Sequence, residues 1–146
     1  MDEVERLIAI EEIKQLKARY FRCMDTKDWD GLAGVFAPDA VMDMSGETGG
    51  DDGVVRGRAE IVEFVRGAIE SVETVHHGHT PEIEITSPST ARGIWAMEDR
   101  LRWRDGGPLR TMHGAGHYHE TYERIEGEWF IRTTTLTRLR VDTDSA

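Results

Sequence analysis

The spacing of the apolar residues changes once along the chain, and this change constrains the fold more than any other feature. From residue 3 to residue 24 the apolar side chains recur at helical spacing, at Ile10, Ile13, Leu16, Tyr20 and Met24. The second half instead holds four segments of alternating apolar and polar residues, separated by turn sequences: 74–86, 90–104, 109–125 and 128–141. Helices followed by an antiparallel meander predict an α+β fold.

Three further elements and one loop complete the predicted order. A turn and a short helix fall within 26–36, a short strand covers 40–44, and a third helix covers 57–72. A chain with this order lays its helices on one face of a curved antiparallel sheet, and the concave space between them forms a pocket. The segment 45–56 is rich in Gly and Asp, and it is either a flap over that pocket or a plain surface connection.

Length, charge and cysteine content narrow the class of protein. The 146 residues predict a single domain, 1–146, with frayed ends at 1–4 and 141–146. The net charge of −10, with no Lys/Arg cluster to offset it, disfavours nucleic acid and anionic membranes as partners. No apolar run approaches the ~20 residues that span a bilayer, and the acidic N-terminus is unlike a signal peptide. The single cysteine, Cys23, excludes an intramolecular disulfide, so we expect a cytoplasmic protein.

One carboxylate falls on an apolar strand face. Strict alternation in 90–104 places one set of side chains together, namely Trp95, Met97, Asp99, Leu101 and Trp103. Burying an unpaired carboxylate in such a face would be costly. Two interpretations of Asp99 follow. It is either structural, in an ion pair or at a strand bulge that resets the alternation, or it is the carboxylate of a binding pocket.

The end of the first helix raises a similar question. Tyr20 lies on the apolar stripe, and its hydroxyl needs a hydrogen-bonding partner. Asp25 lies near the C-terminal end, where the helix dipole disfavours a negative charge. A cationic or hydrogen-bonding partner would account for Asp25, and a histidine is the natural candidate.

Three of the six histidines lie within four residues, at His76, His77 and His79. Three interpretations compete. The first is a metal site, because His77 and His79 share strand parity and so do His117 and His119, although no cysteine or HExxH frame supports it. The second is an Asp–His pair that acts as a general base. The third is a set of surface or interface histidines, and strand parity alone does not settle which imidazole points inward.

Four stretches of the chain together resemble the SnoaL-like branch of the nuclear-transport-factor-2-like superfamily. They read IEEIKQLKARYFRCMDTKDWDGL, HHGHTPEIEI, GIWAMEDRL and YERIEGEWFI, and the resemblance covers residues 5–140. Members include scytalone dehydratase, a hexachlorocyclohexane dehydrochlorinase and ketosteroid isomerases, and the sequence is most similar to the bacterial bile acid 7α-dehydratases. The resemblance implies a cone-shaped α+β barrel, in which the N-terminal helices and a curved sheet enclose a deep pocket.

The resemblance also implies a lyase of the dehydratase type that needs neither a cofactor nor a metal. Its catalytic residues would be Tyr20, Asp25, His76 and Asp99. His76 would take a proton from carbon, and Asp25 would hold the imidazole in place. Tyr20 would bind the leaving hydroxyl or the enolate oxygen, and Asp99 would protonate the leaving oxygen.

The substrate and the assembly follow from the same resemblance. Arg138 comes eleven residues after Gly127 and would hold an oxyanion or a substrate carboxylate. The other expected substrate-binding residues suit a flat polycyclic hydroxy-ketone and are Trp95, Met97, Trp103, His79 and His117. A homo-oligomer is implied, with a trimer favoured. A double-bond isomerase, a dehydrohalogenase and a non-catalytic binding or assembly module remain alternatives.

Overall fold

The computed structural model describes residues 1–104 and 106–145, and its elements follow the predicted order. The helices are α1 (Glu3–Asp25), α2 (Trp29–Ala33), α3 (Ser45–Thr48), the short η1 (Asp51–Gly53) and α4 (Arg58–Ile69). The strands are β1 (Phe36–Asp43), β2 (Val54–Arg56), β3 (Val72–Gly78), β4 (Glu82–Ser87), β5 (Thr90–Trp103), β6 (Leu109–Ile125) and β7 (Glu128–Ser145). The predicted α+β class is confirmed.

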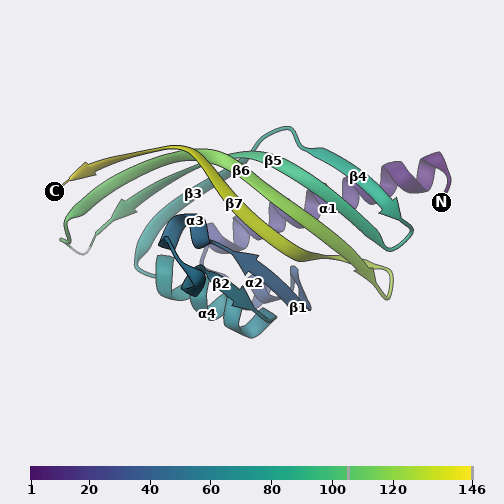
Figure 1. Ribbon diagram of the computed structural model, residues 1–146, viewed down its shortest axis with the longest axis horizontal. Coiled ribbons are helices and arrows are strands. Elements are labelled where there is room, and N and C mark those ends of the chain that lie inside the picture. The colour runs from purple at the N-terminus through teal and green to yellow at the C-terminus, as the bar shows by residue number, and fades with distance from the viewer. Residues whose placement is uncertain (105, 146) are drawn as a thin grey trace.

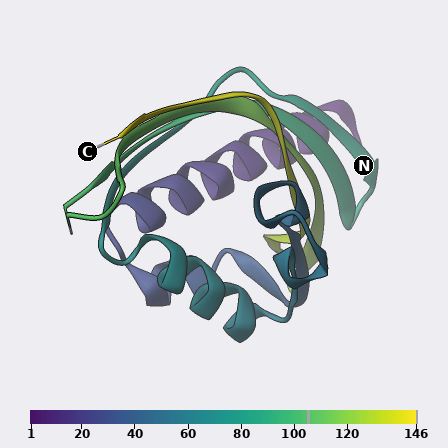
Figure 2. The ribbon, with the colours of Figure 1, turned by 60° about the vertical axis from the view of Figure 1, so that its left-hand side comes forward.

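All strands belong to one curved sheet with the order β2-β1-β7-β6-β5-β3, and β4 also pairs with β5. Neighbouring strands run antiparallel except β1 and β7, which run parallel. Figure 1 shows β5, β6 and β7 sweeping across the molecule, and Figure 2 shows the sheet arching over α1 while α4 lies beneath. The prediction of helices on a curved sheet is thus confirmed. The sheet is mixed rather than wholly antiparallel, and it is open rather than closed into a barrel.

The described chain has a capped helix near its N-terminus and a paired strand at its C-terminal end. At the N-terminus a capping box starts α1, because the Asp2 carboxylate accepts from the Glu5 backbone N–H while the Glu5 carboxylate accepts from the Asp2 N–H. At the C-terminus β7 continues to Ser145, where it pairs with Leu109 of β6. Of the ends predicted to fray, 1–4 and 141–146, residues 3–4 lie in α1 and residues 141–145 lie in β7, while residue 146 lies outside the described residues.

The predicted strand 74–86 is two strands in the structure. β3 pairs with the second half of β5 and β4 pairs with the first half, both antiparallel. The break falls between Gly78 and Glu82, where Pro81 has no backbone N–H to donate to a ladder. β3 and β4 therefore lie in line along one edge of β5.

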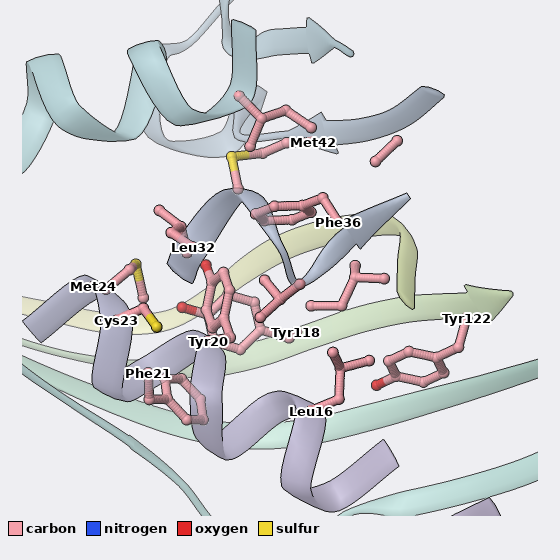
Figure 3. Packing of buried hydrophobic residues seen from close by; sticks show 14 of the residues in the cluster. Leu16, Tyr20, Phe21, Cys23, Met24, Leu32, Phe36, Met42, Tyr118 and Tyr122 are labelled. Carbon is pink, nitrogen blue, oxygen red and sulfur yellow. The ribbon is translucent and has the colours of Figure 1, made fainter. Parts of the chain in front are cut away.

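The core lies between α1 and the concave face of the sheet. Figure 3 shows Tyr20 and Phe21 of α1 among the side chains of Phe36 and Tyr118, and the ring of Tyr20 packs edge-on against both Phe36 and Tyr118. Gly78 lets β3 lie close to Phe21 of α1, since a Cβ at this position would lie 2.6 Å from the Phe21 ring. None of the helices in the described part of the chain combines the length and apolarity needed to cross a bilayer.

Candidate active site

The last residue of α1 and the inward face of β3 meet at a carboxylate–imidazole contact. The Nδ1 atom of His76 lies 2.7 Å from one carboxylate oxygen of Asp25. The His76 backbone N–H donates to the other oxygen at 2.9 Å, and the Thr74 hydroxyl donates to the first at 2.9 Å. These donors compensate for the unfavourable position of Asp25 at the C-terminal end of a helix. The imidazole is well enclosed, with 8% of its side chain exposed.

The hydrogen bonds to Asp25 determine which nitrogen of His76 carries the proton. Partial burial raises the pKa of Asp25, but the hydrogen bonds from His76 and Thr74 and the His76 charge outweigh it, so the pKa is lowered overall. An ionised carboxylate can only accept, so Nδ1 must be the donor. In the neutral ring this leaves the lone pair on Nε2, the nitrogen that a general base would use.

The lowered pKa of Asp25 predicts how stability changes in acid. A carboxyl group with a depressed pKa in the folded state adds stability above its ordinary value of 3.8, and this contribution is lost as the pH falls through the lowered pKa. We expect the free energy of unfolding to fall more steeply on acidification in the wild-type protein than in Asp25→Asn. Urea unfolding across this acid range measures both slopes. Equal slopes would mean that His76 and Thr74 do not stabilise the ionised carboxylate.

Asp99 takes part in an ion pair that faces His76. Its two oxygens accept hydrogen bonds from Arg138 at 2.7 and 3.0 Å, and its side chain is 5% exposed. One of these oxygens lies 4.0 Å from Nε2 of His76. The ion-pair interpretation of Asp99 is therefore what the structure shows. Because both oxygens accept from the guanidinium, the hydrogen bonding does not support the proton-donating role that the resemblance implied.

Arg138 is held by a second carboxylate from the Gly/Asp-rich segment. Glu47 on α3 accepts from Nε of Arg138 at 2.7 Å. Burial lowers the pKa of Arg138, but the hydrogen bonds and charges of Asp99 and Glu47 raise it by more. The pKa is therefore raised overall, and the guanidinium stays charged. Segment 45–56 thus folds into α3, η1 and β2, and contacts the candidate site through Glu47. It is more than the plain surface connection that the sequence left open.

The space for the Asp99–Arg138 pair exists because residue 114 is glycine. A Cβ at Gly114 would overlap both the Arg138 guanidinium and the Asp99 carboxylate. We expect Gly114→Ala to lower the free energy of unfolding by about 1–3 kcal/mol, since overpacking a filled site forces neighbours to shift.

Gly67 on α4 offers a matched control, because a Cβ there meets no atom within 4 Å. Gly67→Ala should stabilise the protein by about 0.5–1 kcal/mol through helix propensity. Denaturant unfolding measures both variants. Equal effects at the two glycines would contradict the tight fit around Gly114.

Tyr20 is fully enclosed and shares a hydrogen bond with the Tyr118 phenol, a residue that was not among those predicted for the site. Burial and then the charge of Glu120 raise the pKa of Tyr20 far above its usual range, with smaller contributions from Asp99 and Asp25. The phenol therefore stays neutral and can donate. The alternation of 109–125 could have revealed Tyr118, because it shares parity with the inward-facing Gly114.

The remaining predicted residues divide between the two faces of the sheet. Trp95 and Met97 are buried on the concave face, and Trp103 is partly buried at the end of β5. His79 and His117 were grouped with the substrate-binding residues, but they lie on the convex face, across the sheet from His76. Register explains this correction, since His79 follows the β3 strand end and bonds Glu98, while His117 pairs with Ala96 on the outward-facing positions of β5.

A separate groove of about 750 Å³ lies on the convex side of the sheet. It is lined chiefly by outward-facing side chains, among them Ile94, His119, Thr121, Thr133 and Thr135. Neither Asp25, His76 nor Asp99 lines this groove, so it is distinct from the candidate site. Within residues 1–104 and 106–145, no group of three or more His, Cys, Asp and Glu side chains has an arrangement that could hold a metal ion.

Comparison with known proteins adds a family and several relatives. Residues 5–135 match the family model of the SnoaL-like domain. The chain is 28% identical over 135 residues to a protein of Gibberella zeae named Probable cyclase FGR4, covering 87% of this chain and 89% of that protein.

Solved structures share the fold at low identity. A scytalone dehydratase-like protein of Novosphingobium aromaticivorans superposes with a TM-score of 0.86 at 17% identity, over 99% of this chain and 93% of that one. A hexachlorocyclohexane dehydrochlorinase of Novosphingobium barchaimii gives 0.84 at 18% identity, over 98% and 94%. At these identities the likeness establishes the shared fold, and the chemistry has to be argued from the side chains.

Proposed function

Because the chain belongs to the SnoaL-like domain family, we propose that it is a cofactor-independent lyase that removes water from a polycyclic, steroid-like hydroxy-ketone. One observation carries this proposal. An ionised Asp25 holds Nδ1 of His76 at 2.7 Å and leaves the lone pair of Nε2 on the concave side of the sheet, where Asp99 also lies. This is the arrangement that a general base requires.

The proposed reaction begins with proton transfer from carbon. Nε2 of His76 takes the proton next to the carbonyl, and the C–H electron pair forms an enolate. Asp25 stabilises the imidazolium through Nδ1, and the nearby Asp99 carboxylate, 4.0 Å from Nε2, stabilises the same charge. The neutral Tyr20 phenol donates a hydrogen bond to the enolate oxygen, because stabilising that developing charge lowers the barrier.

The second step breaks the carbon–oxygen bond. The enolate reforms its carbonyl and expels the hydroxyl on the neighbouring carbon as hydroxide. His76 returns its proton to that oxygen, so that water leaves, an enone remains, and the imidazole is neutral again. This route needs no proton from Asp99, whose two oxygens both accept hydrogen bonds from Arg138.

Relatives and lining residues support the substrate class. Scytalone dehydratase-like and dehydrochlorinase proteins share the fold, and both names describe eliminations. Trp95 and Met97 are buried on the concave face, and Trp103 lies partly buried at its end. Such side chains suit a flat ring system better than a charged metabolite.

The test is a panel of polycyclic compounds assayed with wild-type protein. The panel holds β-hydroxy-ketones, unconjugated enones and β-halo-ketones, and mass spectrometry and NMR score the products. The proposal predicts loss of water from a hydroxy-ketone. Double-bond migration alone would favour an isomerase, and halide release alone would favour a dehydrohalogenase. Tight binding of these compounds with no turnover would favour a binding module.

A further inference from the structure

A buried ion pair between Lys17 and Glu120 lies beside the rings of Tyr20 and Tyr118, and the proposed chemistry does not use it. Nζ of Lys17 on α1 lies 2.7 Å from a carboxylate oxygen of Glu120 on β6, and both side chains are 0% exposed. The Thr134 hydroxyl donates to the same oxygen at 2.6 Å, and the Tyr122 hydroxyl donates to the other at 2.8 Å. Every oxygen of this carboxylate therefore has a partner.

The ammonium group of Lys17 also contacts the faces of both phenol rings. Nζ lies 3.8 Å from the centroid of the Tyr20 ring and 3.7 Å from that of Tyr118. The two rings meet edge to face at 84°, and Figure 3 shows their hydroxyl ends close together. A desolvated cation over an aromatic face is attracted by the negative face of the ring. One cation in contact with two rings restricts the orientation of both.

Stability alone is a poor explanation for this ion pair. Removing two charges from water is costly, and apolar replacements of a buried pair are often neutral or stabilising. Burial lowers the pKa of Lys17 overall, although the Glu120 charge and hydrogen bond partly counteract that effect. The charged form of Lys17 thus depends on Glu120. Its Nζ also lies over the ring of Tyr20, the proposed hydrogen-bond donor to the enolate.

We propose that Lys17, held by Glu120, is a positioning residue that fixes the rings of Tyr20 and Tyr118 so that the Tyr20 phenol meets the enolate oxygen. The catalytic consequence rests on the proposed lyase function, whereas the fixing of the two rings does not. Lys17 touches no reacting atom in this account and acts through Tyr20. Misplacing a catalytic group by about 1 Å can cost on the order of 10²-fold in rate.

The test uses the double variant Lys17→Met/Glu120→Gln, which removes both charges and keeps an acceptor for Thr134. Lys14→Met is the matched control, because Lys14 is exposed on the same helix. Three quantities are measured: the ring-flip rates and chemical shifts of Tyr20 and Tyr118 by NMR, the affinity for β-naphthol as an enolate mimic, and kcat and KM. If the double variant does not fold, the same three measurements are made on Glu120→Gln alone.

We expect faster ring flips, weaker β-naphthol binding and a fall in kcat of about 10–10²-fold with KM nearly unchanged, while Lys14→Met matches the wild type. Unchanged ring flips and naphthol affinity in the double variant would overturn the proposal. If the ring signals change but no hydroxy-ketone is turned over even by the wild type, the lyase function fails while the fixing of the rings by Lys17 stands.

Discussion

Replacing His76 by alanine is expected to lower kcat by about 10²–10⁴-fold, the range that a positioned general acid–base group supplies. The loss should be large because His76 takes part in both proton transfers of the proposed reaction. The fold should survive, since the Asp25 carboxylate keeps its hydrogen bonds from Thr74 and from the backbone N–H of residue 76. Steady-state kinetics on the hydroxy-ketone from the panel measures the loss, and circular dichroism reports the fold.

His77 supplies the matched control for this variant. It is the next residue of β3, and strand alternation places its exposed side chain on the opposite face from His76. His77→Ala should leave kcat within about twofold of the wild type, as expected of a surface substitution remote from the chemistry. If His76→Ala were as active as His77→Ala, the base would have to be another group. If His76→Ala unfolded, the Asp25–His76 contact would be structural.

Replacing Arg138 by methionine is expected to lower the free energy of unfolding by about 3–5 kcal/mol, because it leaves a buried carboxylate without its partner. Asp99 is 4% exposed and receives two hydrogen bonds from Arg138. Methionine retains much of the apolar stem of arginine, so lost packing contributes little. Urea or guanidinium unfolding at neutral pH measures the change.

Two further variants test the cause of that loss. Arg140→Met removes an arginine two residues along β7 whose ion pair with Asp142 is exposed, and it should change stability by about 1 kcal/mol or less. Adding Asp99→Leu to Arg138→Met removes the unpaired charge and should restore most of the lost stability. A double variant as unstable as Arg138→Met would show that the loss comes from Glu47 or from packing instead.

The helices and most strands could be predicted from the sequence because their signals are local. The apolar stripe of α1 and the alternation of β5 each repeat within one segment, and they placed Tyr20 and Asp99 on buried faces. Segment 74–86 was predicted as one strand, although Gly78 and Pro81 permit a bulge or a new strand start there, and its pairing with β5 breaks between Gly78 and Glu82.

The side chains that the predicted site residues contact could not be predicted from local sequence patterns. Lys17 and Glu120 are 103 positions apart in the sequence, and nothing in either segment indicates that they meet. Lys17 lies four residues after Ile13 and three before Tyr20, so helical spacing places it on the apolar stripe, but lysine usually lies on a solvated face. His79 and His117 were placed with the substrate, and only the strand register separates the inward-facing His76 from them.

The most direct test of the account is the tautomer of His76, measured by long-range hydrogen–nitrogen correlation NMR at a pH where the ring is neutral. The account predicts a protonated Nδ1 and a lone pair on Nε2, because the ionised Asp25 accepts from Nδ1. In Asp25→Asn this preference should weaken or reverse. A wild-type ring protonated on Nε2 would contradict the account, since His76 could not then accept a proton from a substrate on the concave side.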